Sequence, residues 1–283
     1  FVVIISWNFY TGESSAITAR NALQKGETQA ALINYEKAVQ KNPLNASYCK
    51  ELGKLYLENG TQGTSRAKGT TDAADANGAP NAKNTQNANA ANAPKDAEAL
   101  KLASNHFRKG VHLARGSGEL RVLYAGTLFQ RGQPAEGVRH LETAVLLRPL
   151  EQEFYEDLAL GYVAAGRLLL EKPTQKERGR TYLRRAIGIP QLLEKHSAQI
   201  NKRHLRYWSG APYLGITPRI QLYCGQAAVL LGDRKAALHY LEQAALDVSL
   251  NAEAELWQDL IPPPENTSPS GDISYSSSSQ DSP

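Results

Sequence analysis

The stretch at residues 22–43, ALQKGETQAALINYEKAVQKNP, sets a glycine between two segments of amphipathic, helix-forming character. Its small residues recur in five units along the chain. The glycine expected to separate two helices appears as Gly26, Gly60, Gly132, Gly166 and Gly232. Seven residues before each of these stands another small residue: Ala19, Gly53, Ala125, Ala159 and Gly225. The sequence therefore predicts a repeat protein.

The second half of each unit has its own spacing, in which a large apolar residue lies between two small ones. The five sets are Ala31, Tyr35, Ala38; Ala103, Phe107, Gly110; Gly137, Leu141, Ala144; Gly179, Leu183, Ala186; and Ala237, Leu241, Ala244. Small side chains three or four positions apart form one stripe of a helix, so two antiparallel helices can approach closely there. Pro43, Pro149 and Pro190 are expected to end second helices.

This pattern resembles the tetratricopeptide repeat, a helix-turn-helix unit of about 34 residues. The resemblance covers roughly residues 16–252, and 34 residues separate Gly132 from Gly166. The large signature residue near the start of the first helix is absent; Ser15, Cys49, Arg121, Tyr155 and Gln221 stand there instead. The resemblance implies an all-α solenoid, a right-handed superhelix of five repeats and a capping helix.

The domain organisation follows from where the repeats are interrupted. Residues 1–12 form a hydrophobic stub, 13–261 the solenoid and 262–283 a disordered tail. Residues 61–96 contain no Val, Ile, Leu or aromatic residue and are predicted to be a disordered insertion. An extra helix and loop are expected within 191–217. A capping helix is expected to cover the end of the stack with Leu256, Trp257 and Leu260.

The stub begins FVVIIS and leads into SWNFY, in a chain that contains no Met. The chain is therefore expected to be a fragment or a processed product. One interpretation makes the stub the tail of a transmembrane helix, with its aromatics at the bilayer interface. The other makes it a buried first strand or helical turn.

Chemistry-bearing motifs are not found in the sequence: it has no phosphate loop, no dinucleotide fingerprint and no histidine pair with metal-ligand spacing. The chain is accordingly predicted to be non-catalytic and to use no cofactor or metal. Cys49 and Cys224 fall on inward positions of first helices and are predicted to be core residues that do not pair. His196 and His204 are predicted to be solvated surface residues.

The remaining candidate site is the concave face, which first helices build in a tetratricopeptide solenoid. The register places seven residues there: Arg20, Lys50, Lys54, Phe129, Glu156, Leu160 and Gln226. Arg20, Lys50 and Lys54 are candidates to hold an anionic group or a peptide carboxylate. Val122 and Gly126 replace the later residues of the family's carboxylate clamp. A protein or peptide partner is the predicted ligand, with ordinary solvated groove residues as the alternative.

A competing hypothesis rests on the basic segment 171–208, which has ten Lys and Arg against three acids. This segment could bind an anionic membrane surface or, less readily, nucleic acid, because only Tyr207 and Trp208 offer stacking rings. Its candidate residues are Arg184, Arg185, Lys202 and Arg203.

A further resemblance concerns the layout of the chain. An apolar stub running directly into YEKAVQKNPLNASYCKELGKLYLENG, followed late in the chain by LGITPRIQLYCGQAAVLLGDRKAALHYLEQAALD, looks like the repeat domain of bacterial O-antigen ligase and polymerase-type membrane proteins. It implies a scaffold associated with a bacterial membrane and with cell-surface glycan assembly. Any catalytic part of such a protein would lie upstream of Phe1.

Overall fold

A computed structural model describes the backbone of residues 2–68, 82–204 and 214–262, and the side chains of 9–60, 97–199 and 214–262. All the elements it describes are helical. They are α1 (Val2–Gln24), α2 (Thr28–Lys41), α3 (Ala46–Lys68), α4 (Ala82–Leu113), α5 (Gly118–Gln130), α6 (Pro134–Leu147), α7 (Gln152–Leu170), the 3-10 turn η1 (Pro173–Gln175), α8 (Lys176–Ile187), α9 (Ile189–His204), α10 (Pro218–Leu231), α11 (Arg234–Ala245) and α12 (Asn251–Gln258).

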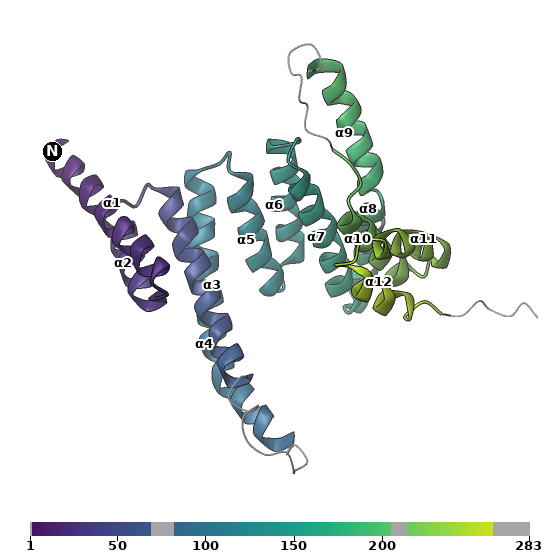
Figure 1. Cartoon of the computed structure of the whole chain (residues 1–283), viewed down its shortest axis with the longest axis horizontal. Helices are drawn as coiled ribbons and strands as arrows, with labels where there is room; N and C mark the ends of the chain where they lie inside the picture. The colour runs from purple at the N-terminus through teal and green to yellow at the C-terminus, as the bar shows by residue number, and fades with distance from the viewer. Residues whose placement is uncertain (1, 69–81, 205–213, 263–283) are drawn as a thin grey trace, which may run out of the picture.

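The helices form hairpins that stack in a single row (Figure 1). The paired helices are α1 with α2, α3 with α4, α5 with α6, α7 with α8 and α10 with α11. The second helices α2, α4 and α6 also contact the first helix of the next pair. In the same way α8 contacts α10, the first helix of the last pair. This is the predicted all-α tetratricopeptide-like solenoid, in which each pair buries its apolar face only by stacking on its neighbours.

Close approach within a hairpin occurs at the small residues of the repeat. A methyl group on Gly53 would lie 2.6 Å from Cε1 of Phe107, and one on Gly225 would lie 2.6 Å from Cδ2 of Leu241. Ala125 and Ala159 are fully buried. The large residue of the second helix therefore occupies the space that a side chain on the first helix would need.

The separating glycines behave in two ways. Gly26, Gly132 and Gly232 have φ values of 76°, 69° and 78°, the left-handed conformation that ends a helix and favours glycine. The prediction is wrong for Gly60 and Gly166, which lie inside α3 and α7. Both helices continue past the expected turn because an insertion follows it.

In unit four the continuation of α7 changes the packing. A methyl group on Gly166 would lie 2.5 Å from Leu183, so Gly166 takes the contact that the register assigns to Ala159. The helix ends at Leu170, and Pro173 starts η1. The glycine is thus used for close helix approach instead of for a turn.

The inserted segments differ in their boundaries from the sequence expectation. Helices α3 and α4 extend into 61–96 from both sides and project together from the row (Figure 1), while 69–81 lie outside the described residues. The tract is rich in alanine, the residue with the highest helix propensity. Helix α9 occupies the segment for which an extra helix is predicted, and the tail from 263 onward lies outside the described residues.

The hydrophobic stub is continuous with the first repeat, because α1 runs unbroken from Val2 to Gln24. Phe9 and Tyr10 on it are 45% and 71% exposed. Among the helices of the described ranges, none combines the length and apolar character that a membrane span requires.

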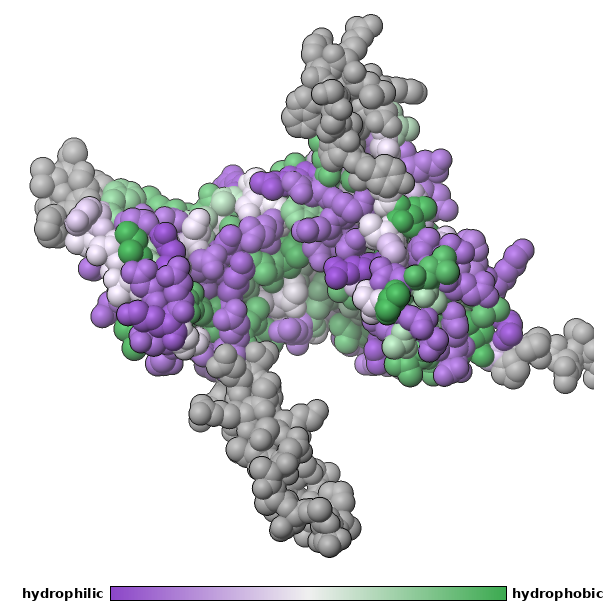
Figure 2. Space-filling model, in the orientation of Figure 1, coloured by the Kyte–Doolittle hydropathy of each residue, from purple (hydrophilic) through white to green (hydrophobic). Residues whose placement is uncertain are grey.

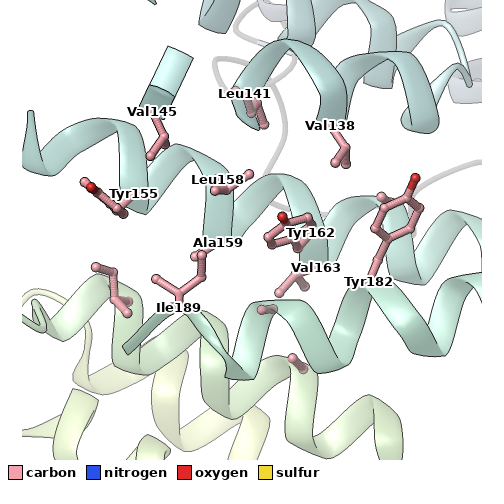
Figure 3. Close-up of a cluster of buried hydrophobic side chains, with 14 of the residues drawn as sticks. Val138, Leu141, Val145, Tyr155, Leu158, Ala159, Tyr162, Val163, Tyr182 and Ile189 are labelled. Carbon is pink, nitrogen blue, oxygen red and sulfur yellow. The ribbon is translucent and has the colours of Figure 1, made fainter. Parts of the chain in front are cut away.

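The largest buried cluster joins α6, α7 and α8 (Figure 3). Val138, Leu141 and Val145 of α6 face Tyr155, Leu158 and Tyr162 of α7 in this view, with Ile189 at the start of α9 on the other side. Tyr155 is fully buried, and its hydroxyl donates to the carbonyl of Pro149 at 2.9 Å. Tyr155 thus replaces the missing signature residue as a large core side chain.

The capping helix covers the stack with Trp257, as predicted, but not with Leu256 and Leu260. Leu256 and Leu260 are 67% and 63% exposed, whereas Ala254 is fully buried and Trp257 packs partly against the core of α10 and α11. Hydrophobic surface consequently shows through the hydrophilic cover at the α10–α12 end of the row (Figure 2). The prediction is wrong for Leu256 and Leu260 because a helix of eight residues offers little periodicity from which to assign its buried face.

Candidate functional groove

One position of the first helices lies immediately after the buried small residue and defines the candidate groove. It is occupied by Arg20, Lys54, Gly126, Leu160 and Gln226 in the five repeats. First helices contact each other directly where α5 meets α7 and where α7 meets α10. Arg20, Gly126 and Leu160 are exposed, and no atom lies within 4 Å of the position that a methyl group on Gly126 would take. This position is therefore exposed on α1, α5 and α7.

The lysines of the groove form a bridge between repeats two and three. Lys50 Nζ lies 3.1 Å from Glu119 Oε2, and Lys54 Nζ lies 3.5 Å from Glu119 Oε1. Both lysines also lie within 4.0 Å of Glu51 Oε1. The positive charge predicted to hold a ligand carboxylate is thus already balanced by carboxylates of the chain itself.

A hollow of about 490 Å³ lies at the N-terminal end of this groove. It is lined by Arg20, Leu23, Gln24, Tyr35, Ser47, Tyr48, Lys50 and Glu51. Arg20 Nη2 lies 2.6 Å from Glu13 Oε1, and the hydroxyl of Tyr48 donates to the other oxygen of Glu13. Burial, together with this bond to Glu13, raises the pKa of Tyr48 to about 12. The hollow is therefore lined by side chains of both positive and negative charge and by aromatic rings.

The C-terminal end of the groove is closed. Gln226 is only 5% exposed and donates to Glu253 Oε1 of α12 at 2.9 Å. Phe129 is partly buried, and a methyl group on Gly137 would lie 3.0 Å from its ring. Glu156 accepts from Thr217 Oγ1 at 2.8 Å and lies 3.5 Å from Arg219 Nη1. The structure thus brings Arg20, Lys50 and Lys54 together at one end and leaves Leu160 as the exposed residue at the other.

Asp157 of α7 carries the most displaced carboxyl among the described groups for which a value is resolved. Burial, reinforced by the nearby charges of Glu156 and Glu153, raises its pKa from 3.8 to about 6. Since the folded-state pKa lies above the unfolded value, the folded state favours the protonated form. The stability that protonation contributes is complete below about pH 4 and is lost as the pH rises through 6.

We therefore expect Asp157→Asn to raise the free energy of unfolding at pH 8 by about 2 kcal/mol and to flatten its pH dependence between about pH 4 and 6. Urea titrations of both proteins across this range measure the effect. Glu242→Gln, at an exposed position of α11, is the matched control. A pH profile that is unchanged by Asp157→Asn would show that this carboxyl does not titrate as described.

The basic segment is partly engaged in contacts within the chain. Arg185 Nη1 lies 3.1 Å from Glu142 Oε1, and the guanidinium groups of Arg178 and Arg185 lie 5.9 and 5.8 Å from the ring centre of Tyr182. Arg184 is exposed on α8. The side chains of Lys202 and Arg203 lie outside the described residues, as do those of His204, Tyr207 and Trp208. The structure therefore gives no support to a continuous anion-binding face in this segment.

Two predictions about single residues have different outcomes. Cys49 and Cys224 are fully buried and unpaired, as predicted, and burial raises the pKa of the Cys224 thiol to about 12. His196 is only partly exposed: its Nδ1 lies 2.7 Å from the hydroxyl of Tyr155, and burial lowers its pKa. No group of three or more His, Cys, Asp and Glu positioned to hold a metal ion occurs within the described ranges.

The sequence reasoning missed a second and larger hollow, of about 910 Å³, which lies away from the groove. It is bounded mainly by α4, the second helix of repeat two, and also by the connection between α2 and α3 and by residues of α5 and α6. Its basic residues come largely from RKGVHLAR at 108–115. The sequence feature that could have predicted this hollow is the run of basic residues at the end of a second helix. Its spacing places Arg108 and His112 on one helical face.

Comparison with known proteins supports the fold class alone. No protein-family model and no curated protein matches the chain. The chain is similar to the solved structure of the MamA protein, with a TM-score of 0.50 and 16% identity over 86% of this chain and 94% of that one. It is also similar, at a TM-score of 0.37 and 18% identity, to pilF of Pseudomonas aeruginosa, over 89% of this chain and 96% of that one. A tetratricopeptide repeat protein from Parabacteroides merdae is similar at a TM-score of 0.25 and 14% identity, over 89% of this chain and 99% of that one.

Proposed function

We propose that this solenoid is a non-catalytic interaction module that takes a segment of a partner protein in the groove of its first helices. The observation that carries this proposal is the open groove position at Arg20, Gly126 and Leu160, closed at Gln226 by the capping helix. The absence of a side chain on Gly126 leaves room for a ligand backbone to approach α5. Charged and tyrosine-lined walls at one end and Leu160 at the other suit a segment with both polar and apolar residues.

The proposal is tested with a substitution that fills the groove without disturbing the core. Gly126→Trp places a large ring in open space, since nothing lies within 4 Å of that position. A partner captured from a bacterial extract and then purified should bind this variant about 30-fold or more weakly, as when a central contact is lost. Gln40→Trp, at an exposed position of second helix α2, is the matched control and should bind as the unaltered chain does. Equal affinities for both variants would place the partner elsewhere.

We also propose the setting of a bacterial membrane protein of the O-antigen ligase and polymerase type, in which the solenoid organises cell-surface glycan assembly. The supporting observations are the order of an apolar stub and repeats in the sequence and the unbroken course of α1 from the stub into the first repeat. The gene sequence upstream of Phe1 tests this setting. About ten or more hydrophobic spans of roughly 20 residues would support it, and an upstream sequence without such spans would contradict it.

A further inference from the structure

The larger hollow has two kinds of wall. Its basic wall consists of Arg108, Lys109, Arg115 and Arg121, with His112 and His140 beside them. Its apolar wall consists of Pro43, Leu44, Val111, Leu113 and Tyr124, and Leu44 is 69% exposed. The volume of about 910 Å³ is that of a small-molecule site. The hollow is therefore suited to a ligand with one charged end and one apolar end.

The positive charges of this hollow have no carboxylate partner among the described residues. No Asp or Glu oxygen of the described ranges lies within 4.0 Å of the charged nitrogens of Arg108, Lys109, Arg115 or Arg121. Glu136 is the single acid in the lining.

The lack of a carboxylate partner is clearest for Arg121, because this side chain is half-buried on α5. Its Nη2 donates to the carbonyl of Arg115 at 2.9 Å, and its Nη1 lies 3.4 Å from Nδ1 of His140. Its Nε is buried without a hydrogen-bond partner. Burial and then the charge of Arg121 lower the pKa of His140, so this imidazole is neutral at pH 7. A buried guanidinium normally has a counter-ion, and here the chain does not supply one.

We propose that this hollow binds a small organic phosphate or pyrophosphate ester, with the phosphate on Arg108, Arg115 and Arg121 and the organic part on Leu44 and Tyr124. Several guanidinium groups lining one hollow match the charge and the hydrogen-bonding needs of phosphate. A single carboxylate would leave most of this charge unbalanced. Single-stranded nucleic acid is disfavoured, because Tyr124 is the one large aromatic ring in the lining and successive bases need several.

The experiment is titration calorimetry of the whole chain with inorganic pyrophosphate and, separately, with inorganic phosphate. Saturable binding at a stoichiometry of about one is expected, and the stronger of the two ligands indicates a diphosphate or a monophosphate ester. Arg121→Gln should weaken binding about 10-fold or more, the loss expected for a hydrogen bond to a charged group. Arg139→Gln removes an exposed cation of α6 outside the lining and is the charge-matched control.

A second variant keeps the test independent of folding, because Arg121 also bonds to the carbonyl of Arg115 in the connection between α4 and α5. The double change Arg108→Gln and Arg115→Gln alters two exposed side chains and should weaken pyrophosphate binding at least as much. No saturable binding of either anion at millimolar concentration, or an equal loss in the Arg139→Gln control, would overturn the proposal. Binding of a glutamate-rich peptide without binding of pyrophosphate would overturn it also. Neither result would affect the groove, which lies on the first helices.

Discussion

Replacing Phe107 with alanine is expected to lower the free energy of unfolding by about 3–5 kcal/mol. Phe107 is fully buried on α4, and its ring fills the space left by the missing side chain of Gly53 on α3. Removing the ring opens a cavity between two backbones that cannot close without moving the hairpin. Urea denaturation followed by circular dichroism at 222 nm measures the loss.

The matched control for this change is Phe9→Ala, which removes the same ring from a side chain that is 45% exposed. Its effect should stay within about 0.5 kcal/mol. A loss of similar size for both variants would show that the two rings contribute alike, and would contradict the tight packing of α3 against α4.

Replacing Leu241 with alanine is expected to cost about 2–5 kcal/mol, with a loss confined to the C-terminal end of the row. Leu241 is fully buried and belongs, with Leu222, Ala244 and Ala254, to a small core separate from the one around Tyr155. Repeat solenoids are coupled mainly between nearest neighbours, so this small core can open by itself.

Hydrogen exchange measured by mass spectrometry distinguishes a local from a global effect. The Leu241→Ala variant should lose protection in α10, α11 and α12, while α5, α6 and the first half of α7 keep theirs. Leu246→Ala, at a position that is 77% exposed after α11, should leave the exchange pattern unchanged. A uniform loss of protection along the chain in Leu241→Ala would mean that the solenoid unfolds as one unit.

The fold could be predicted from the sequence because close approach of the paired helices requires small residues at particular positions. A side chain on Gly53 or Gly225 cannot coexist with Phe107 or Leu241 at the observed distances, so the requirement for small residues recurs with the repeat. The prediction of a turn is wrong at Gly166 because glycine serves close helix approach as well as turns. Only the packing of the following helix decides between these uses.

The candidate site was harder to predict because side-chain partners come from other repeats. Lys50 and Lys54 are on the expected face, yet Glu119 lies 65 or more positions away in the sequence and neutralises them. Gln226 has the right register but is covered by Glu253 of α12. Periodicity assigns a residue to a face of its own helix and gives no information on what a distant segment places there.

The central claim is that paired helices touch at Gly53 and Phe107, and Gly53→Ala measured in two backgrounds tests it most directly. In the unaltered chain this change should destabilise, because the new methyl group would lie 2.6–2.9 Å from the Phe107 ring. In the Phe107→Ala background it should stabilise by about 0.5–1 kcal/mol, the ordinary advantage of alanine over glycine in a helix. Stabilisation of that size in both backgrounds would contradict close approach of the helices at this position.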